Sequence, residues 1–254
     1  MIVSHRYGFV FLKTRKTAGT SVELALRTVL GPDDIATPLS RDEERMAAAR
    51  HIPGPQNYLR LLRDIEPGKI PDLFRSLGNN LKRGNGNQRV PVLNPYRQHL
   101  NAYKARHKIG TTNWNRYFKF TIERNPWART VSYYHWVCRN QTNPMPFTEF
   151  VTRGRGYLNE SNYSIYSIHG IPIADYWIRY ETLKQGLDHV AAHLELPVNL
   201  SETIDPIWAK SQSRDRPPYP DYYNAETRRI VALQYANEIA LMGYRFDDLD
   251  YERG

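Results

Sequence analysis

The sequence predicts an α/β fold in which a central, mostly parallel sheet is flanked by helices. Short runs of β-forming residues alternate with helical patterns, an order typical of parallel sheets covered on both faces. The length of 254 residues suits a single domain over residues 1–254. Hydrophobic residues make up 41% and charged residues 24%, values close to globular averages, so the composition excludes a wholly disordered chain.

The first expected unit consists of a strand, a polar loop and a helix. Residues 7–12, YGFVFL, form an apolar and aromatic run typical of a buried strand. After a polar loop over residues 13–21, apolar residues recur at helical spacing from Val22 to Leu30. Gly31-Pro32 is expected to end this helix.

Residues 33–95 give weaker signals. Short helices are expected over residues 41–50 and 56–64. Residues 67–95 are rich in Pro, Gly, Asn, Arg and Lys, which predicts an irregular, basic surface insertion and not a separate domain. We interpret this insertion as a solvated loop, with an acceptor-binding lip as the alternative.

A second strand–turn–helix unit follows the insertion. Residues 100–109 predict a short helix ending at Gly110, and residues 117–122, YFKFTI, predict a strand. Pro126 stands at the first position of the next helix, where proline is favoured. One face of that helix is expected to carry Trp127, Val131, Tyr134 and Cys138.

The last third of the chain predicts one more strand and two helices. The strand is expected over residues 173–180 and the first helix over 181–194. Residues 201–223 contain several prolines and are expected to be irregular. Asn224 is expected to cap a final helix over residues 225–242.

The charge balance points to an anionic partner. Lys and Arg number 35 against 26 for Asp and Glu, a formal net charge of +9, which suits nucleic acid, anionic lipid or a polyphosphate ligand. No helix-turn-helix, zinc-finger or ribonucleoprotein motif is present, so a nucleic-acid partner is not expected. The single cysteine, Cys138, excludes a disulfide framework and a Cys-rich metal site within the chain.

Neither a membrane span nor an export signal is expected from the sequence. No run reaches 18 apolar residues, and the first residues lack the apolar core of a signal peptide, so a cytoplasmic location is expected. The Asn-x-Ser/Thr sequons at Asn140, Asn159, Asn162 and Asn199 are therefore interpreted as chance matches.

The loop at residues 13–21 has the features of a phosphate-binding loop. A Gly-containing loop between a strand and a helix directs backbone N–H groups to one point, and the helix dipole adds positive potential there. The order differs from the Walker A motif because Lys16 precedes Gly19. The alternative is an ordinary capped helix start, with Thr17 or Ser21 as the cap.

A second candidate block begins at Arg124. This residue follows the predicted strand at its carboxyl end, where ligands of open α/β sheets bind. Ser132 lies two turns into the next helix, so only a large ligand beside the helix start would touch both. The alternative is that Arg124 pairs with a surface carboxylate and Ser132 faces the core or solvent.

Together the two blocks resemble the sulfotransferases that use 3′-phosphoadenosine 5′-phosphosulfate (PAPS). The 5′-phosphosulfate loop of that family commonly reads Pro-Lys-Thr-Ala-Gly-Thr-Ser, and residues 15–21 read RKTAGTS. The 3′-phosphate motif commonly reads Arg-Asn-Pro-Trp-x-Arg-x-x-Ser-x-Tyr, and residues 124–134 match it with Ser132 in register. Arg15 replaces the family's proline, which affects the stiffness of the loop but removes no donor. The likeness is closest to the bacterial and carbohydrate-type branch and implies a P-loop-like domain.

The resemblance implies in-line transfer of a sulfuryl group from PAPS to a hydroxyl of a carbohydrate or small-metabolite acceptor. The nucleotide product would be adenosine 3′,5′-bisphosphate (PAP). It implies that Lys16 stabilises the leaving phosphate and that His99 is the general base, since His99 matches the family's base position. Histidine suits this task because its pKa lies near neutrality. The expected cofactor-binding residues are Arg15, Lys16, Thr17, Ala18, Gly19, Thr20, Ser21, Arg124, Ser132, Lys210 and Ser211.

No metal is expected. His189 and His193 share a helical face, but Val190 stands where the zinc motif requires Glu. Three alternatives remain beside O-sulfation: N-sulfation of an amine or guanidine by the same fold, a P-loop kinase, and a nucleotide-binding protein without catalysis. The order of Lys16 and Gly19 and the lack of an acidic metal ligand near the loop speak against a kinase.

Overall fold

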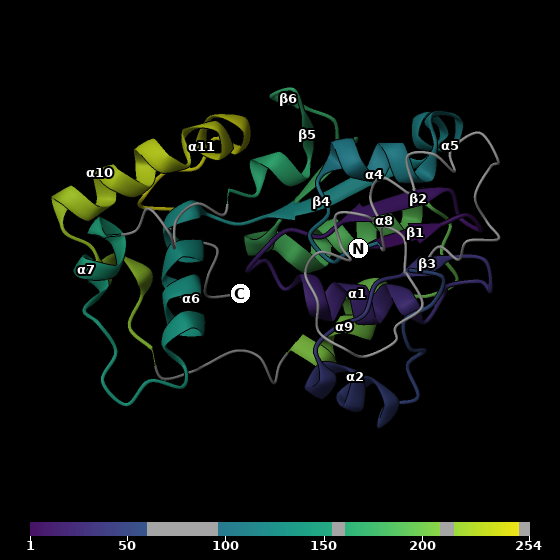
Figure 1. The fold of residues 1–254 in the computed structure, drawn as a ribbon, viewed down its shortest axis with the longest axis horizontal. Coiled ribbons are helices and arrows are strands. Elements are labelled where there is room, and N and C mark those ends of the chain that lie inside the picture. Colours follow the sequence, from purple (N-terminus) through teal and green to yellow (C-terminus); the bar gives the residue numbers. More distant parts are fainter. Residues whose placement is uncertain (60–95, 154–160, 209–215, 249–254) are drawn as a thin grey trace, which may run out of the picture.

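A five-stranded sheet in the order β3-β1-β2-β4-β7 forms the centre of the computed structural model (Figure 1). Its strands pair in parallel from β2 to β4 and from β4 to β7, while β1 is antiparallel to both β2 and β3. Four of the five strands therefore run in one direction, which confirms the expected mostly parallel sheet. The strands are β1 (Ile2–Ser4), β2 (Phe9–Leu12), β3 (Ile35–Ala36), β4 (Phe118–Glu123) and β7 (Tyr176–Arg179).

The structure describes residues 1–59, 96–153, 161–208 and 216–248. The predicted insertion at 67–95 lies outside these ranges, and so do Lys210 and Ser211. The described helices are α1 (Gly19–Arg27), α2 (Arg41–Ala48), α4 (Ala102–Ile109), α5 (Thr111–Arg116), α6 (Pro126–Cys138), α7 (Phe147–Thr152), α8 (Leu183–His193), α9 (Leu200–Trp208), α10 (Ala225–Gln234) and α11 (Ala236–Met242). Short 3₁₀ turns lie at Tyr163–Ile165, Tyr180–Thr182 and Tyr219–Tyr222, and a small hairpin joins β5 (Ser167–Ile168) to β6 (Ile171–Pro172).

The two faces of the sheet are covered by different helices because side chains alternate along β2. Phe9 and Phe11 pack with α1, α8 and α9 on one face. Val10 and Leu12 pack with α4 and α5 on the other. Both faces are thus buried, as the sequence pattern predicts. None of the described helices combines the length and the apolar character needed to cross a membrane.

A third group of helices lies beside the sheet. α6, α7, α10 and α11 share an apolar cluster with the turn at Tyr219–Tyr222, and Figure 1 shows them gathered at the left of the view. α6 belongs to this cluster. It also carries part of the second candidate block, because the helix starts just after β4 and Arg124. The second candidate block therefore lies where the sheet meets this group of helices.

Three sequence-based expectations were wrong in detail. Gln56 does not start a helix but pairs with Ala36 in an isolated β-bridge. The segment expected to be irregular from residue 201 begins instead with α9, whose start is capped by the Asn199 side chain. The expected final helix is broken at Tyr235 into α10 and α11.

Candidate functional site

The loop between β2 and α1 makes an unusual turn. Lys16 (φ 61°) and Ala18 (φ 58°) both adopt the left-handed backbone conformation, which non-glycine residues rarely use. Ala18 is the N-cap of α1, and no side chain caps this helix. The alternative of an ordinary start capped by Thr17 or Ser21 is therefore wrong. Within the described ranges, the first N–H groups of α1 therefore have no capping side chain, and an open helix start of this kind can bind an anion.

Two threonines fix the base of this loop. The Thr14 hydroxyl donates to the carbonyl of Ile122 in β4, and the Thr14 and Thr17 hydroxyl oxygens lie 2.8 Å apart. Thr17 is fully buried, so its hydroxyl serves the loop and faces away from solvent. Ser21 is also buried, whereas Thr20 is half-buried.

Gly19 allows the chain to pass close to itself. A Cβ atom at this position would lie 2.9 Å from Lys13 Cγ and 3.2 Å from the Thr14 carbonyl oxygen. Real Cβ atoms essentially never approach within 3.0 Å of another heavy atom. Steric contact therefore disfavours any residue with a Cβ atom at the first position of α1.

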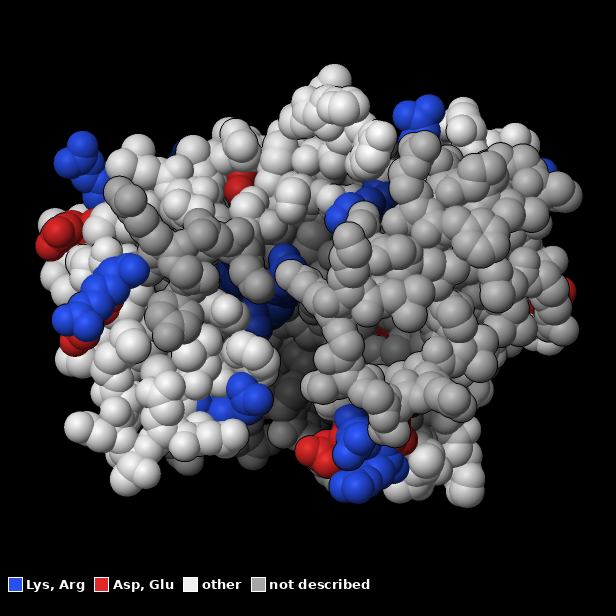
Figure 2. All heavy atoms as spheres, viewed as in Figure 1, with Lys and Arg blue, Asp and Glu red and all other residues white. Residues whose placement is uncertain are grey.

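Lys16 is half-buried among cations. Its Nζ lies 5.8 Å from the centroid of the exposed Trp136 ring on α6. Burial lowers the pKa of Lys16 to about 8, and the charges of Arg124, Arg139 and Arg216 act in the same direction. Figure 2 shows Lys and Arg side chains inside a hollow near the centre of this face. This concentration of positive charge is the electrostatic environment that an anionic ligand requires.

The second block forms a closed turn. Asn125 accepts from the backbone N–H groups of Trp127 (3.0 Å) and Ala128 (3.4 Å), and Pro126 fills the first helical position as predicted. The Arg124 guanidinium lies over the Tyr180 ring, 4.2 Å from its centroid. The charge of Arg124 acts on the pKa of Lys16, and Ser132 lies half-buried on α6.

Residues after β7 hold this turn in place. The Glu181 carboxylate accepts from the Asn125 backbone N–H (2.7 Å) and from the Tyr244 hydroxyl (3.1 Å). Tyr244 also donates to the backbone carbonyl of Glu123 (3.1 Å). The end of β7 and the segment around Tyr244 therefore position the arginine turn; residues 178–183 and 242–246 resemble family segments in sequence, but the sequence did not indicate this task.

His99 lies against the start of the loop. Its Nδ1 is 2.9 Å from the Lys13 carbonyl oxygen. Because a carbonyl only accepts, Nδ1 carries the proton and the lone pair is on Nε2. Burial lowers the pKa of His99 to about 4, and the charges of Lys13 and Arg15 also lower it. The imidazole is therefore neutral at pH 7, in the tautomer that a base acting through Nε2 requires.

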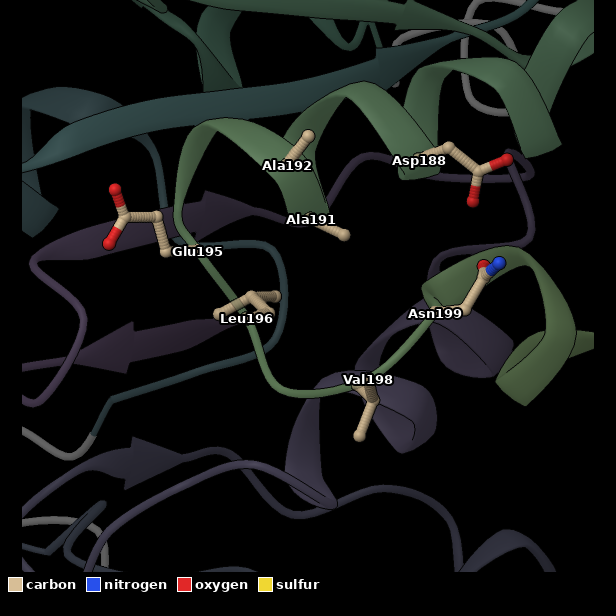
Figure 3. Close-up of a pocket in the computed structure, with 7 residues that line it drawn as sticks. All are labelled: Asp188, Ala191, Ala192, Glu195, Leu196, Val198 and Asn199. Atoms are coloured by element: carbon tan, nitrogen blue, oxygen red, sulfur yellow. The ribbon is translucent and has the colours of Figure 1, made fainter.

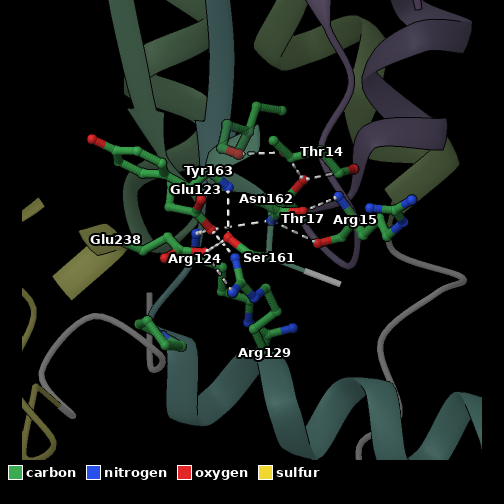
Figure 4. Close-up of polar contacts among 12 residues, drawn as sticks. Thr14, Arg15, Thr17, Glu123, Arg124, Arg129, Ser161, Asn162, Tyr163 and Glu238 are labelled. Atoms are coloured by element: carbon green, nitrogen blue, oxygen red, sulfur yellow. Dashed lines mark hydrogen bonds and ion pairs between the residues drawn. The ribbon is translucent and has the colours of Figure 1, made fainter. Parts of the chain in front are cut away.

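A buried polar cluster lies beneath both blocks (Figure 4). Glu123, fully buried at the end of β4, binds Arg129 (2.6 Å), Tyr166 (2.9 Å) and Asn162 (3.2 Å). Asn162 in turn bonds the backbone of Arg15 in the loop. Sequence reasoning missed this cluster and interpreted Asn162 only as a chance sequon. The local signals are that Glu123 directly precedes Arg124 and that its partner Arg129 is the second arginine of the motif at residues 124–134.

A pocket elsewhere in the structure does not suit an anion. It has a volume of about 320 Å³ and lies between α8 and the start of α9, with Asp188 and Glu195 in its lining (Figure 3). None of its lining residues belongs to either block. In the part of the chain that the structure describes, no group of three His, Cys, Asp or Glu side chains is arranged to hold a metal. The His189 ring instead stacks on Tyr176, and the His193 ring lies tilted against Phe118.

Comparisons with known proteins indicate the family of this chain. An uncharacterized protein of Archaeoglobus fulgidus is 32% identical over 107 residues, which cover 41% of this chain and 89% of that protein. No solved structure matches the chain. A family model described as the sulfotransferase family matches residues 1–172, a span that includes the loop, His99 and the Arg124 turn. The chain therefore belongs to the sulfotransferase family.

Proposed function

We propose that this protein transfers a sulfuryl group from PAPS to a hydroxyl of a carbohydrate or small-metabolite acceptor. Family membership supports sulfotransfer in general. The observation that carries the proposal is the pairing of β2 with β4, which sets the uncapped, lysine-bearing loop after β2 beside Arg124, the residue that directly follows β4. Two anion sites at one edge of a sheet suit a nucleotide with phosphates at both its 3′ and 5′ positions.

The donor set fits such a cofactor. The uncapped start of α1 at Gly19, Thr20 and Ser21 supplies N–H groups for the 5′-phosphosulfate end. Arg124 and Ser132 are proposed to bind the 3′-phosphate, since a guanidinium binds phosphate oxygens in a bidentate manner. Bound PAPS would supply the sulfuryl group. Arg15, Thr17, Ala18, Lys210 and Ser211 remain predicted cofactor contacts, the last two outside the described residues.

Lys16 and His99 are proposed to carry the two proton-linked tasks. With its pKa near 8, Lys16 is mostly protonated at pH 7, so its ammonium can stabilise the charge that develops on the leaving phosphate. His99 Nε2 accepts the proton of the acceptor hydroxyl. The charges of Lys13 and Arg15 lower the pKa of His99, so an anionic ligand beside them raises its basicity.

The first test is a thermal-shift and calorimetric titration with PAP, using ATP, ADP and 5′-AMP as controls. A ligand at 100 times its Kd stabilises the folded state by about 2.7 kcal/mol, which for this chain length raises Tm by roughly 5–10 °C. Selective stabilisation by PAP is expected. A response to ATP with magnesium and none to PAP would refute the proposal and favour a kinase.

The same titration on His99→Ala separates an enzyme from a binding protein. The variant is expected to bind PAP with wild-type affinity but to transfer sulfate roughly 10²–10⁴-fold more slowly, the usual contribution of a general base. Turnover is measured with labelled PAPS on a panel of hydroxyl and amine acceptors. Wild-type turnover by His99→Ala would contradict the assignment of the base.

A further inference from the structure

Asn162 is bonded to the donor loop by both ends of its amide. Its side chain is fully buried just before the turn at Tyr163–Ile165. Its Oδ1 accepts from the backbone N–H of Arg15 (2.9 Å), and its Nδ2 donates to the backbone carbonyl of the same residue (3.2 Å). Figure 4 shows these two contacts side by side. The amide thus binds Arg15 as a neighbouring strand would.

The second N–H of this amide is used as well. Nδ2 also donates to Glu123 Oε1 at 3.2 Å. The same carboxylate oxygen accepts from the backbone N–H of Arg124 (3.0 Å) and from Arg129 (2.6 Å). Both amide hydrogens and the amide oxygen therefore have partners, which fixes the orientation of the Asn162 side chain.

These contacts connect the two blocks through one short path. Asn162 holds the backbone of Arg15 and bonds the carboxylate that binds the backbone of Arg124. Arg15 directly precedes Lys16, where the chain enters its left-handed turn. A residue that fixes both backbone groups of Arg15 therefore fixes the point from which Lys16 and the start of α1 are directed.

We propose that Asn162 is a positioning residue that sets the donor loop against the Arg124 turn, so that one nucleotide engages both. This inference rests on the proposed function, since it assigns the two blocks to the 5′ and 3′ ends of one ligand. Asparagine is required because aspartate would lose both donated hydrogen bonds and would set a carboxylate against Glu123 and the Arg15 carbonyl.

The test compares three nucleotides on Asn162→Ala and Asn162→Asp. PAP and 5′-AMP use the loop, whereas 3′-AMP uses only the Arg124 side. We expect the Kd of PAP and of 5′-AMP to rise about tenfold in Asn162→Ala, as for the loss of a buried hydrogen-bond partner, and at least as much in Asn162→Asp. The Kd of 3′-AMP is expected to stay unchanged in Asn162→Ala, because Glu123 still binds the Arg124 backbone and Arg129 in that variant. Ser161→Ala is the matched control, because Ser161 bonds Glu238 (2.7 Å) and not the loop.

Hydrogen exchange gives a readout that needs no ligand. In the wild type and in Ser161→Ala, the Arg15 amide is expected to be protected, and this protection is lost in Asn162→Ala. Wild-type affinities together with retained protection in Asn162→Ala would overturn the inference. Equal weakening of all three nucleotides would also overturn it, since that pattern indicates a general structural defect. A wild type that binds none of the nucleotides would instead overturn the proposed function, and this inference with it.

Discussion

The two strand–loop–helix units of this protein begin their helices in opposite ways. In the first, the N-cap residue of α1 is Ala18, which has no side chain that can cap the helix. Ala18 and Lys16 are the two left-handed residues of the preceding loop. In the second, the Asn125 side chain caps the start of α6, and Pro126 fills the first helical position. Among the described residues, no side chain caps the first helix start, whereas the Asn125 side chain accepts from two N–H groups of the second.

This difference separates two ways of binding a phosphate. An open helix start binds through backbone N–H groups and needs a loop of exact shape, so it depends on glycine and on contacts beneath the loop. A closed turn can bind only through a side chain, which we propose is Arg124 here, and needs only a rigid base. Changes in the open loop should therefore affect ligand binding and catalysis first, and changes in the closed turn should affect stability first.

The largest effect is expected at Lys16 in the open loop. Lys16→Ala removes the ammonium proposed to stabilise the leaving phosphate, so kcat should fall by roughly 10²–10³. The measurement is a single-turnover rate at saturating PAPS, with PAP affinity measured in parallel. Wild-type kcat in this variant would show that the loop binds but does not take part in the chemistry.

The pH profile of kcat/KM tests the proposed roles of Lys16 and His99 together. kcat/KM reports the free enzyme, so it should rise as His99 loses its proton near pH 4 and fall as Lys16 loses its proton near pH 8. Lys16→Arg is expected to remove the alkaline fall, since arginine stays protonated. An alkaline limb that persists in this variant would assign the limb to another group.

A smaller effect is expected from Gly19→Ala. The added Cβ would lie within 3.2 Å of the Thr14 carbonyl, so the loop must shift, and such overpacking typically costs about 1–3 kcal/mol. We expect PAP affinity to fall roughly tenfold or more in calorimetry. Gly186→Ala on α8 is the matched control, because its Cβ would lie 2.4 Å from Ile178 Cγ2, away from both blocks. It should lower the free energy of unfolding without changing PAP affinity, and equal affinity losses in both variants would contradict the comparison.

The smallest effect is expected from Asn125→Ala in the closed turn. Loss of the helix cap should lower the free energy of unfolding by about 0.5–2 kcal/mol, read as a lower urea midpoint at unchanged m-value. Affinity for 5′-AMP should stay the same, because this ligand engages only the open loop. A clear loss of 5′-AMP affinity would mean that the two helix starts are not independent.

Much of the fold could be predicted because its signals are local. The β2 run, Pro126 at the start of α6 and Asn224 as the cap of α10 all act within a few residues. α9 was missed although Asn199 carries a cap signal, because the prolines that follow suggested a loop. β1 and β3 were missed because strands of three and two residues have too short a pattern to recognise.

The site divides in the same way. The order of residue types alone indicated the loop and the Arg124 turn, since anion binding at a helix start needs glycine, lysine and hydroxyl residues in a short span. The absent cap at Ala18 and the internal role of Thr17 became visible only in three dimensions. The hydrogen bond that Thr14 makes in holding the loop crosses 108 residues to Ile122.

By itself, the sequence determined the two strand–loop–helix units and pointed to them as the proposed anion-binding blocks, because those signals depend on neighbours along the chain. Only the tertiary structure decided that His99 contacts Lys13 and that Asn162 holds the backbone of Arg15. The second of these contacts joins residues 147 positions apart. No local pattern encodes it, since it exists only once packing has brought these distant segments together.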